Sequence, residues 1–311
     1  MPETQSPETQ ADEGESRCGF VALLGAPNVG KSTLTNQLAG TKVSIVTHKV
    51  QTTRARIRAI VIEGASQLIL VDTPGIFTPK RRLDRAMVDA AWSGAGDADM
   101  VVILIDAASG LDQDTERILE RSRDLPMPVV IALNKIDQVR KDRLLVLAQA
   151  VAARTSCQDT FMISAINGDG IPDLKACLAS RMPVGPWLYP EDQISDAPLR
   201  HTAAEITREK LYLRLHDELP YASTVETTDW KTLKDGSVRI EQTIFVQRAS
   251  QKKIVLGAQG RAIKQISMEA RGEIAGMLET PVHLFLFVKV REKWGDDPER
   301  YREIGLEFPK G

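Results

Sequence analysis

Short runs of apolar residues alternate with helical patterns from Gly19 to Arg181. The apolar runs are bounded by turn residues and predict strands at residues 20–25, 56–63, 67–72, 100–106, 129–134 and 161–164. Strands that alternate with helices are typical of β-α-β units and a mostly parallel sheet. Several of these runs end in polar or glycine residues, and open α/β sheets bind ligands at the carboxyl ends of their strands.

A different pattern follows the proline-rich residues 182–200, which can form neither a helix nor a central strand. A helical pattern at residues 203–219 precedes two alternating runs, 222–228 and 237–246, and Asp235-Gly236 between these runs is a strong hairpin signal. Helical stretches at residues 254–276 and a strand at 282–290 complete an α-β-β-α-α-β order. We therefore predict a disordered tail (1–16), an α/β domain (17–182), a linker (183–200), an α+β domain (201–295) and a C-terminal tail (296–311).

Composition narrows the class of protein. The 311 residues are 42% hydrophobic and 26% charged, which is typical of a folded globular chain of roughly two domains. The formal net charge is −2, so any nucleic-acid binding requires a local basic patch. No apolar run approaches the roughly 18 residues of a membrane span, and the first residues are acidic where a signal peptide is basic and then apolar. We expect a cytoplasmic protein.

A phosphate-binding motif follows the first predicted strand. Its residues are Gly25, Ala26, Pro27, Asn28, Val29, Gly30, Lys31 and Ser32, with Thr33 next, and they match the pattern G-x-x-x-x-G-K-S before a helical run. The glycines allow backbone N–H groups and the helix N-terminus to face phosphate oxygens. Lys31 supplies a charge to the β- and γ-phosphates, and the Ser32 hydroxyl is a Mg²⁺ ligand. The motif predicts a nucleoside triphosphate site.

Two further strand ends carry polar motifs. Asp72-Thr73-Pro74-Gly75 ends the third strand, where the carboxylate can hold Mg²⁺ through water and the Gly75 N–H can approach a γ-phosphate. Taken alone, Pro-Gly is also ordinary turn chemistry.

Asn134-Lys135-Ile136-Asp137 ends the fifth predicted strand. The Asp137 carboxylate can accept hydrogen bonds from N1–H and the 2-amino group of guanine, whereas adenine would present an acceptor there. Such a turn alone is common at surfaces. Ser164-Ala165 follows the sixth strand, where a backbone N–H can meet guanine O6, or where small residues simply begin a helix. In this order, the motifs predict a guanine nucleotide site.

These motifs resemble the GTPase fold of the Ras-like translation-factor class. The resemblance implies that switch I contains Gln51, Thr52, Thr53 and Arg54. It favours Thr53 over its neighbour Thr52 as the Mg²⁺ ligand that senses the γ-phosphate, so the expected metal ligands are Ser32, Thr53 and Asp72, and the expected catalytic residues are Lys31, Thr53, Gly75 and Asn28. Ile76 stands where such enzymes carry a glutamine that orients water. This resembles a subclass in which the residue at Asn28 helps bind K⁺; alternatively, Asn28 only shapes the loop.

The second domain carries its own motif, Gly257-Ala258-Gln259-Gly260. The glycines lie among Lys252, Lys253, Arg261 and Lys264, and no acidic residue falls between Gln251 and Gln265. A G-x-x-G turn between packed helices is by itself a weak signal, and the charges alone would fit a solvated helix face. With the α-β-β-α-α-β order, the motif resembles a type II KH domain, which clamps about four single-stranded nucleotides.

The whole layout resembles the bacterial Era-like GTPases, from about residue 19 to residue 294. The resemblance implies a P-loop GTPase domain followed by an α+β type II KH domain, with GTP or GDP and Mg²⁺ as ligands. It also implies slow GTP hydrolysis, binding to the 3′ end of small-subunit ribosomal RNA, and a role in small-subunit assembly. The implied location is the cytoplasm with peripheral contact at the inner membrane, and we expect a monomer. A non-catalytic, nucleotide-holding RNA or protein adaptor is the alternative.

Overall fold

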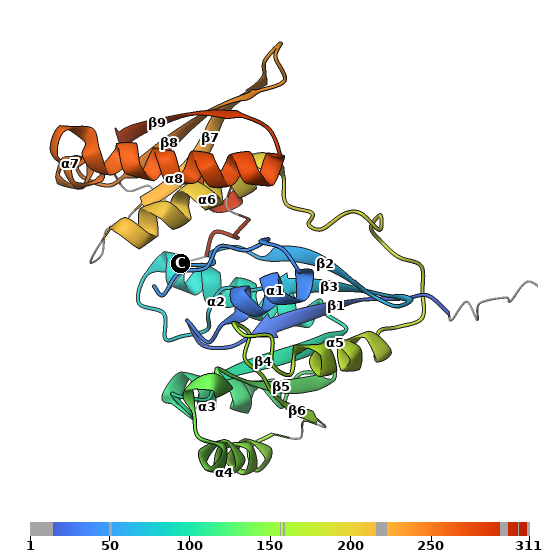
Figure 1. The fold of residues 1–311 in the computed structure, drawn as a ribbon. Helices are drawn as coiled ribbons and strands as arrows, with labels where there is room; N and C mark the ends of the chain where they lie inside the picture. Colours follow the sequence, from blue (N-terminus) through green and yellow to red (C-terminus); the bar gives the residue numbers. More distant parts are fainter. Residues whose placement is uncertain are drawn as a thin grey trace, which may run out of the picture.

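A computed structural model describes residues 15–49, 52–155, 157, 159–215, 223–292, 298–303 and 305–309. The first part of the chain forms an α/β layer structure (Figure 1). Its strands are β1 (Arg17–Leu24), β2 (Ile57–Glu63), β3 (Ser66–Asp72), β4 (Met100–Asp106), β5 (Val129–Asn134) and β6 (Asp159–Met162). Its helices are α1 (Lys31–Ala39), α2 (Arg82–Gly96), α3 (Gln113–Ser122), α4 (Lys141–Ala152) and α5 (Ile171–Ser180), with a short 3₁₀ turn, η1 (Ile136–Gln138).

The strands form one six-stranded sheet in the order β2-β3-β1-β4-β5-β6. All neighbours are parallel except β2 and β3, which form an antiparallel hairpin. The central strands β1, β3, β4 and β5 read as continuous apolar runs because helices cover both faces of the sheet. Consequently β1, β3, β4 and β5 present their carboxyl ends, and the motifs that follow β1, β3 and β5, at one edge.

The later part of the chain forms a three-stranded sheet covered by helices. The strands β7 (Ser223–Thr232), β8 (Val238–Val246) and β9 (Val282–Val290) pair in sequence order, β7 antiparallel and β9 parallel to β8. The helices α6 (Leu199–Arg214), α7 (Ala249–Leu256) and α8 (Arg261–Leu278) bury apolar side chains against it. The hairpin predicted at Asp235-Gly236 joins β7 to β8, and Gly236 has a positive φ. The helix predicted at residues 203–219 begins earlier, at Leu199, and residues 216–222 lie outside the described part.

The C-terminal segment differs from the predicted tail. Pro298–Glu303 forms helix α9, and Tyr301 and Leu306 are buried against Leu83 and Met87 of α2. In Figure 1 the C-terminus of the chain lies beside α2. The prediction missed this packing because the apolar residues of the segment are too few to show a helical period.

The predicted linker also pairs with the first domain. The Ile60 N–H donates to the Ile194 carbonyl at 2.8 Å, and the Cys18 N–H donates to the Pro183 carbonyl at 3.0 Å. Residues 183–195 therefore run along the first domain, so the linker has a defined course.

Candidate nucleotide site and G-x-x-G loop

A cleft of about 500 Å³ opens at the carboxyl edge of the first sheet. This volume is in the range of small-molecule sites. The cleft brings together three predicted motifs and part of the loop between α1 and β2. Its lining residues are Pro27, Asn28, Gly30, Lys31, Ser32, Thr33, Ile45, Val46, Thr47, His48, Thr52, Thr53, Thr73, Gly75, Lys135 and Ile166.

The loop after β1 is shaped as a phosphate cradle. Gly30 has φ of 101° and is the N-cap of α1, and a β-carbon on it would lie 2.3 Å from the Asn134 amide nitrogen. Only glycine fits this backbone and this close approach. The Lys31 Nζ donates to the carbonyls of Gly25 and Ala26, each at 3.0 Å. Burial lowers the pKa of Lys31 to about 8, and the Asp72 carboxylate opposes that shift. An anion in the cleft would raise the pKa of Lys31 again, because it favours the charged ammonium.

Three oxygen-bearing side chains meet beside Lys31. The hydroxyls of Ser32 and Thr53 lie 2.8 Å apart, and the Ser32 hydroxyl donates to Asp72 Oδ2 at 2.7 Å. Asp72 is fully buried, and its Oδ1 has no hydrogen-bond partner among the described residues. Burial raises the pKa of Asp72, while Ser32 and Lys31 lower it. Two hydroxyls and a buried carboxylate with an uncompensated oxygen fit a Mg²⁺ ion, which prefers oxygen ligands.

The four predicted switch I residues have different positions. The hydroxyl of Thr53, the residue that the family resemblance favours as a metal ligand, lies beside that of Ser32. The hydroxyl of Thr52 instead lies 2.6 Å from that of Thr47 and donates to the Lys49 carbonyl at 2.7 Å. Arg54 points away from the cleft to the second domain, and Gln51 lies outside the described residues. The hydroxyls of the two threonines therefore have different neighbours, and that of Thr53 lies beside Ser32.

The predicted base-binding residues form a connected group. The Ser164 hydroxyl donates to Asp137 Oδ1 at 2.6 Å, and the Ala165 N–H donates to Asn134 Oδ1 at 2.9 Å. The Asn134 amide also donates to the Val29 carbonyl at 2.7 Å, which joins this group to the phosphate loop. Lys135 has φ of 64° and forms an ion pair with Asp106 at 2.7 Å.

Asn28 and Ile76, the two residues that the sequence analysis connects with the mechanism of hydrolysis, differ in polarity. Asn28 has φ of 62°, and its amide donates to the His48 carbonyl at 3.1 Å. Ile76 is buried, and its N–H donates to the Gly25 carbonyl at 3.0 Å. Gly75 lines the cleft, while Pro74 is buried behind it. Ile76, which directly follows the Asp72–Gly75 motif, therefore anchors the loop through its backbone and has no polar side chain that could hold a water molecule.

Sequence reasoning missed one wall of the cleft. Ile45, Val46, Thr47 and His48 line it from the loop between α1 and β2. These residues match no motif pattern. Asn36 holds their base, because its side-chain oxygen accepts the N–H groups of Val43 and Ser44, each at 2.8 Å.

The G-x-x-G loop lies between α7 and α8 on the second domain. Gly257 has φ of 71°, and a β-carbon there would lie 2.7 Å from the Ala262 β-carbon. Gln259 also has a positive φ, and Gly260 faces open space. Around the loop, Lys253, Ala258, Gln259, Arg261 and Lys264 are exposed and Lys252 is half-buried. The sharp turn thus presents backbone and cations together.

The apolar neighbours of the loop divide between core and surface. Ile254 is exposed, Val255 is fully buried and Ile263 is partly buried. Trp294, which follows the last predicted strand and could stack on RNA, lies outside the described residues. Of the three, only Ile254 presents most of its side chain to a ligand.

No metal-ligating cluster of histidine, cysteine and acidic residues occurs within the described ranges. No helix in the part of the chain that the structure describes has the length and apolar character needed to cross a membrane.

Comparison with known proteins places both domains in described families. The family "50S ribosome-binding GTPase" matches residues 20–135, and the KH domain family matches residues 218–295. The chain is 64% identical to GTPase Era of Afipia carboxidovorans over 310 residues, covering 100% of both chains. It is 64% identical to GTPase Era of Brucella suis over 302 residues, covering 97% of this chain and 96% of the relative.

The fold is similar to two crystal structures of Era. One contains MgGDPNP and nucleotides 1506–1542 of 16S ribosomal RNA, and the other is an Aquifex aeolicus Era variant bound to GDP and AlF₄⁻. Each has a TM-score of 0.88 and 36% sequence identity, and each covers 93% of this chain and 99% of the other.

Proposed function

The chain belongs to the Era family of GTPases, and from that premise we propose that it is a GTP-dependent switch that binds the 3′ end of small-subunit ribosomal RNA. In this proposal it assists assembly of the small ribosomal subunit, in the cytoplasm and in peripheral contact with the inner membrane. The observation that carries the GTP-dependent part of the proposal is the meeting of Ser32, Thr53 and Asp72 beside Lys31.

The motif residues in and around the cleft have proposed roles with the nucleotide. The loop from Gly25 to Thr33 surrounds the phosphates through its N–H groups, and Lys31 neutralises the β- and γ-phosphates. Ser32, Thr53 and Asp72 hold Mg²⁺ directly or through water, and the ion, when bound, stabilises negative charge on the phosphates. Asp137 accepts the guanine N1–H and amino group, and the backbone at Ser164-Ala165 faces O6. Asn134 and Lys135 hold these loops together.

Hydrolysis without a glutamine requires another source of transition-state stabilisation. Ile76 offers no hydrogen bond to water, so we propose that K⁺ bound beside Asn28 adds a positive charge near the phosphates. Phosphate release under multiple-turnover conditions should be several-fold faster in KCl than in NaCl at equal ionic strength. An Asn28→Ala variant should lose that difference, and equal rates in the two salts with the unmodified chain would contradict the K⁺ role.

The second domain supplies the RNA site in this proposal. One solved relative contains Era with a 16S ribosomal RNA fragment that spans nucleotides 1506–1542, and this chain presents a G-x-x-G turn among exposed cations. Close backbone approach at Gly257 and Gly260 and phosphate contacts from Lys252, Lys253, Arg261 and Lys264 fit single-stranded RNA. Ala258 and Gln259 lie at the tip of the turn.

The test measures binding of a short single-stranded RNA from that 3′ end, with GTP analogue, GDP or no nucleotide. We expect tight binding that the GTP analogue favours and that Gly257→Asp with Gly260→Asp abolishes. Gly272→Asp is the matched control, because Gly272 is exposed on α8 and a β-carbon there meets nothing within 4 Å. The proposed switch would be refuted if the RNA affinity were the same with GTP analogue, GDP and no nucleotide, and were also unchanged in the variant that lacks the loop glycines.

The second candidate function is a non-catalytic adaptor that only holds nucleotide. The apolar Ile76 is the observation that favours it. Repeated turnover with release of inorganic phosphate distinguishes the enzyme from the adaptor, which would release at most one phosphate per chain.

A further inference from the structure

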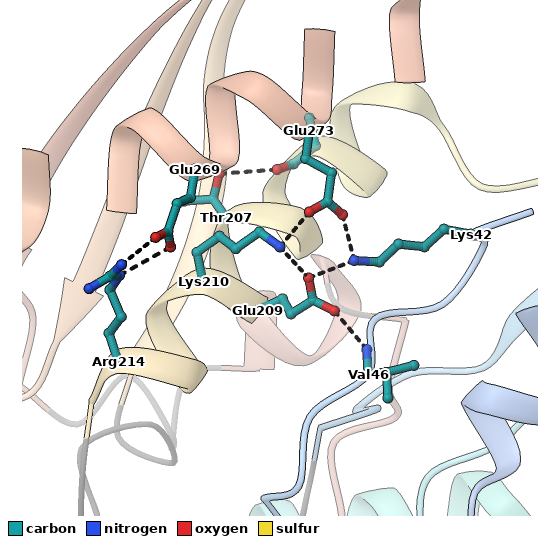
Figure 2. Close-up of polar contacts among 9 residues, drawn as sticks. Lys42, Val46, Thr207, Glu209, Lys210, Arg214, Glu269 and Glu273 are labelled. Atoms are coloured by element: carbon teal, nitrogen blue, oxygen red, sulfur yellow. Dashed lines mark hydrogen bonds and ion pairs between the residues drawn. The ribbon is translucent and has the colours of Figure 1, made fainter. Parts of the chain in front are cut away.

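Helix α6 of the second domain lies directly against the loop that carries the switch threonine. Figure 2 shows the first part of this contact. Glu209 on α6 accepts the Val46 N–H at 2.9 Å through one oxygen and pairs with Lys42 at 2.6 Å through the other. Lys42 and Lys210 both also pair with Glu273 of α8. The lysines lower the pKa of Glu209 against the opposing effect of burial, so the carboxylate stays charged.

A second contact lies at the other end of the same loop. The Arg208 guanidinium donates to the Thr52 carbonyl at 2.5 Å and is oriented by a two-point pair with Glu205. Arg208 is 1% exposed and lies 5.0 Å from the centre of the Tyr212 ring. Burial by itself would lower the pKa of Arg208, but the Glu205 carboxylate raises it. The guanidinium is therefore a fixed cation.

Arg54 extends this contact from the first domain. Its guanidinium donates to the Tyr212 hydroxyl at 2.7 Å and to the Ser223 carbonyl at 2.9 Å. Arg54 directly follows Thr53, so the residues on both sides of that threonine are held by the second domain.

We propose that Arg208 is a positioning residue for Thr53 and that α6 selects the GTP-bound conformation of switch I. This inference rests on the proposed function. The peptide that Arg208 holds is the one joining Thr52 to Thr53, and the Thr53 hydroxyl lies with Ser32 at the Mg²⁺ position. A buried charged donor fixes such a carbonyl more strongly than a neutral donor does.

Docking of α6 and binding of the nucleotide must affect each other equally, because the two equilibria are thermodynamically linked. If docked α6 favours the ordered conformation of switch I, it raises the affinity for GTP, because GTP binding needs that conformation. Bound GTP in turn favours docking of α6. GDP lacks the γ-phosphate that Thr53 would sense, so its affinity depends little on α6. Removing Arg208 should therefore reduce discrimination between the two nucleotides without weakening GDP binding.

The experiment compares affinities for a non-hydrolysable GTP analogue and for GDP, with Mg²⁺, in the full-length Arg208→Met protein. We expect affinity for the analogue to fall about tenfold, as for loss of one charge-assisted hydrogen bond, and GDP affinity to stay within about twofold. Arg214→Met is the matched control, because Arg214 lies on the same helix and pairs with Glu269 inside the second domain. It should leave both affinities unchanged.

A second variant, Lys42→Met, tests the same contact in case Arg208→Met does not fold. Lys42 is 38% exposed, and Lys42→Met removes its two ion pairs without opening a core cavity. It should lower affinity for the analogue about threefold and leave GDP affinity unchanged. If the variants weaken both nucleotides equally, or neither, the positioning role is refuted. If the unmodified chain itself fails to bind the analogue, the proposed function fails instead.

Discussion

The side chain of Asn134 joins the phosphate loop to the base-binding loops, so its loss should affect both stability and nucleotide binding. Asn134 is 2% exposed, and its amide makes two hydrogen bonds, to the Val29 carbonyl at 2.7 Å and from the Ala165 N–H at 2.9 Å. Asn134→Ala leaves the Val29 carbonyl and the Ala165 N–H without these hydrogen bonds, and leaving a buried polar group unpaired costs about 1–3 kcal/mol. We expect the free energy of unfolding to fall by about 2–4 kcal/mol.

Urea unfolding followed by far-ultraviolet circular dichroism measures this change, and titration with fluorescent GDP measures binding. GDP affinity should fall at least tenfold, about 1.4 kcal/mol, because two loops that form the cleft lose their common anchor. Asn167→Ala is the matched control, since Asn167 is exposed on the neighbouring loop and should change stability by less than about 0.5 kcal/mol. A loss below about 0.5 kcal/mol in Asn134→Ala, with unchanged GDP affinity, would refute the anchoring role.

Three further changes have distinct expected results. Asp137→Asn should weaken GTP and favour xanthosine triphosphate in a competition assay, because an amide can donate to the 2-oxo group of xanthine; unchanged base preference would contradict the assigned contact. Arg208 holds the pKa of Glu205 below its ordinary value in the folded chain. The ionised Glu205 therefore contributes its full stabilisation above about pH 4.3, and this contribution is lost as the pH falls through the pKa of the folded state. In Glu205→Gln the free energy of unfolding should decrease less steeply as the pH is lowered. Leu306→Ala should lower the free energy of unfolding by about 2–4 kcal/mol in urea titrations, because Leu306 is 3% exposed against α2, whereas a surface residue would change it little.

Much of the architecture followed from hydrophobic period and turn chemistry. The strands predicted at 100–106, 129–134 and 282–290 have those same bounds, because their apolar or alternating runs end in a polar residue or directly before one. The predicted convergence of the first three motifs also follows from parallel strands, whose carboxyl ends must meet at one edge.

Contacts between the two domains could not be predicted in the same way. Arg208 and Glu209 are charged, and charged residues on a helix usually face solvent. In the folded chain both are buried, because the loop of the first domain packs against this side of α6. The pairing of Tyr301 and Leu306 with α2 joins residues more than two hundred positions apart in sequence, beyond the reach of any local period. Long-range packing of this kind depends on the folded surfaces that meet.

The packing of α9 and the following residues on α2 affects how the chain can be divided for experiments. A fragment cut in the linker would expose the side chains of Leu83, Ala86 and Met87 that Tyr301 and Leu306 cover in the intact chain. Such a patch favours self-association, so the isolated nucleotide-binding half should be less soluble, and the exposed helix is α2, the first helix after the Asp72–Gly75 motif. Measurements on the separated nucleotide-binding half would therefore understate what it does in the intact chain.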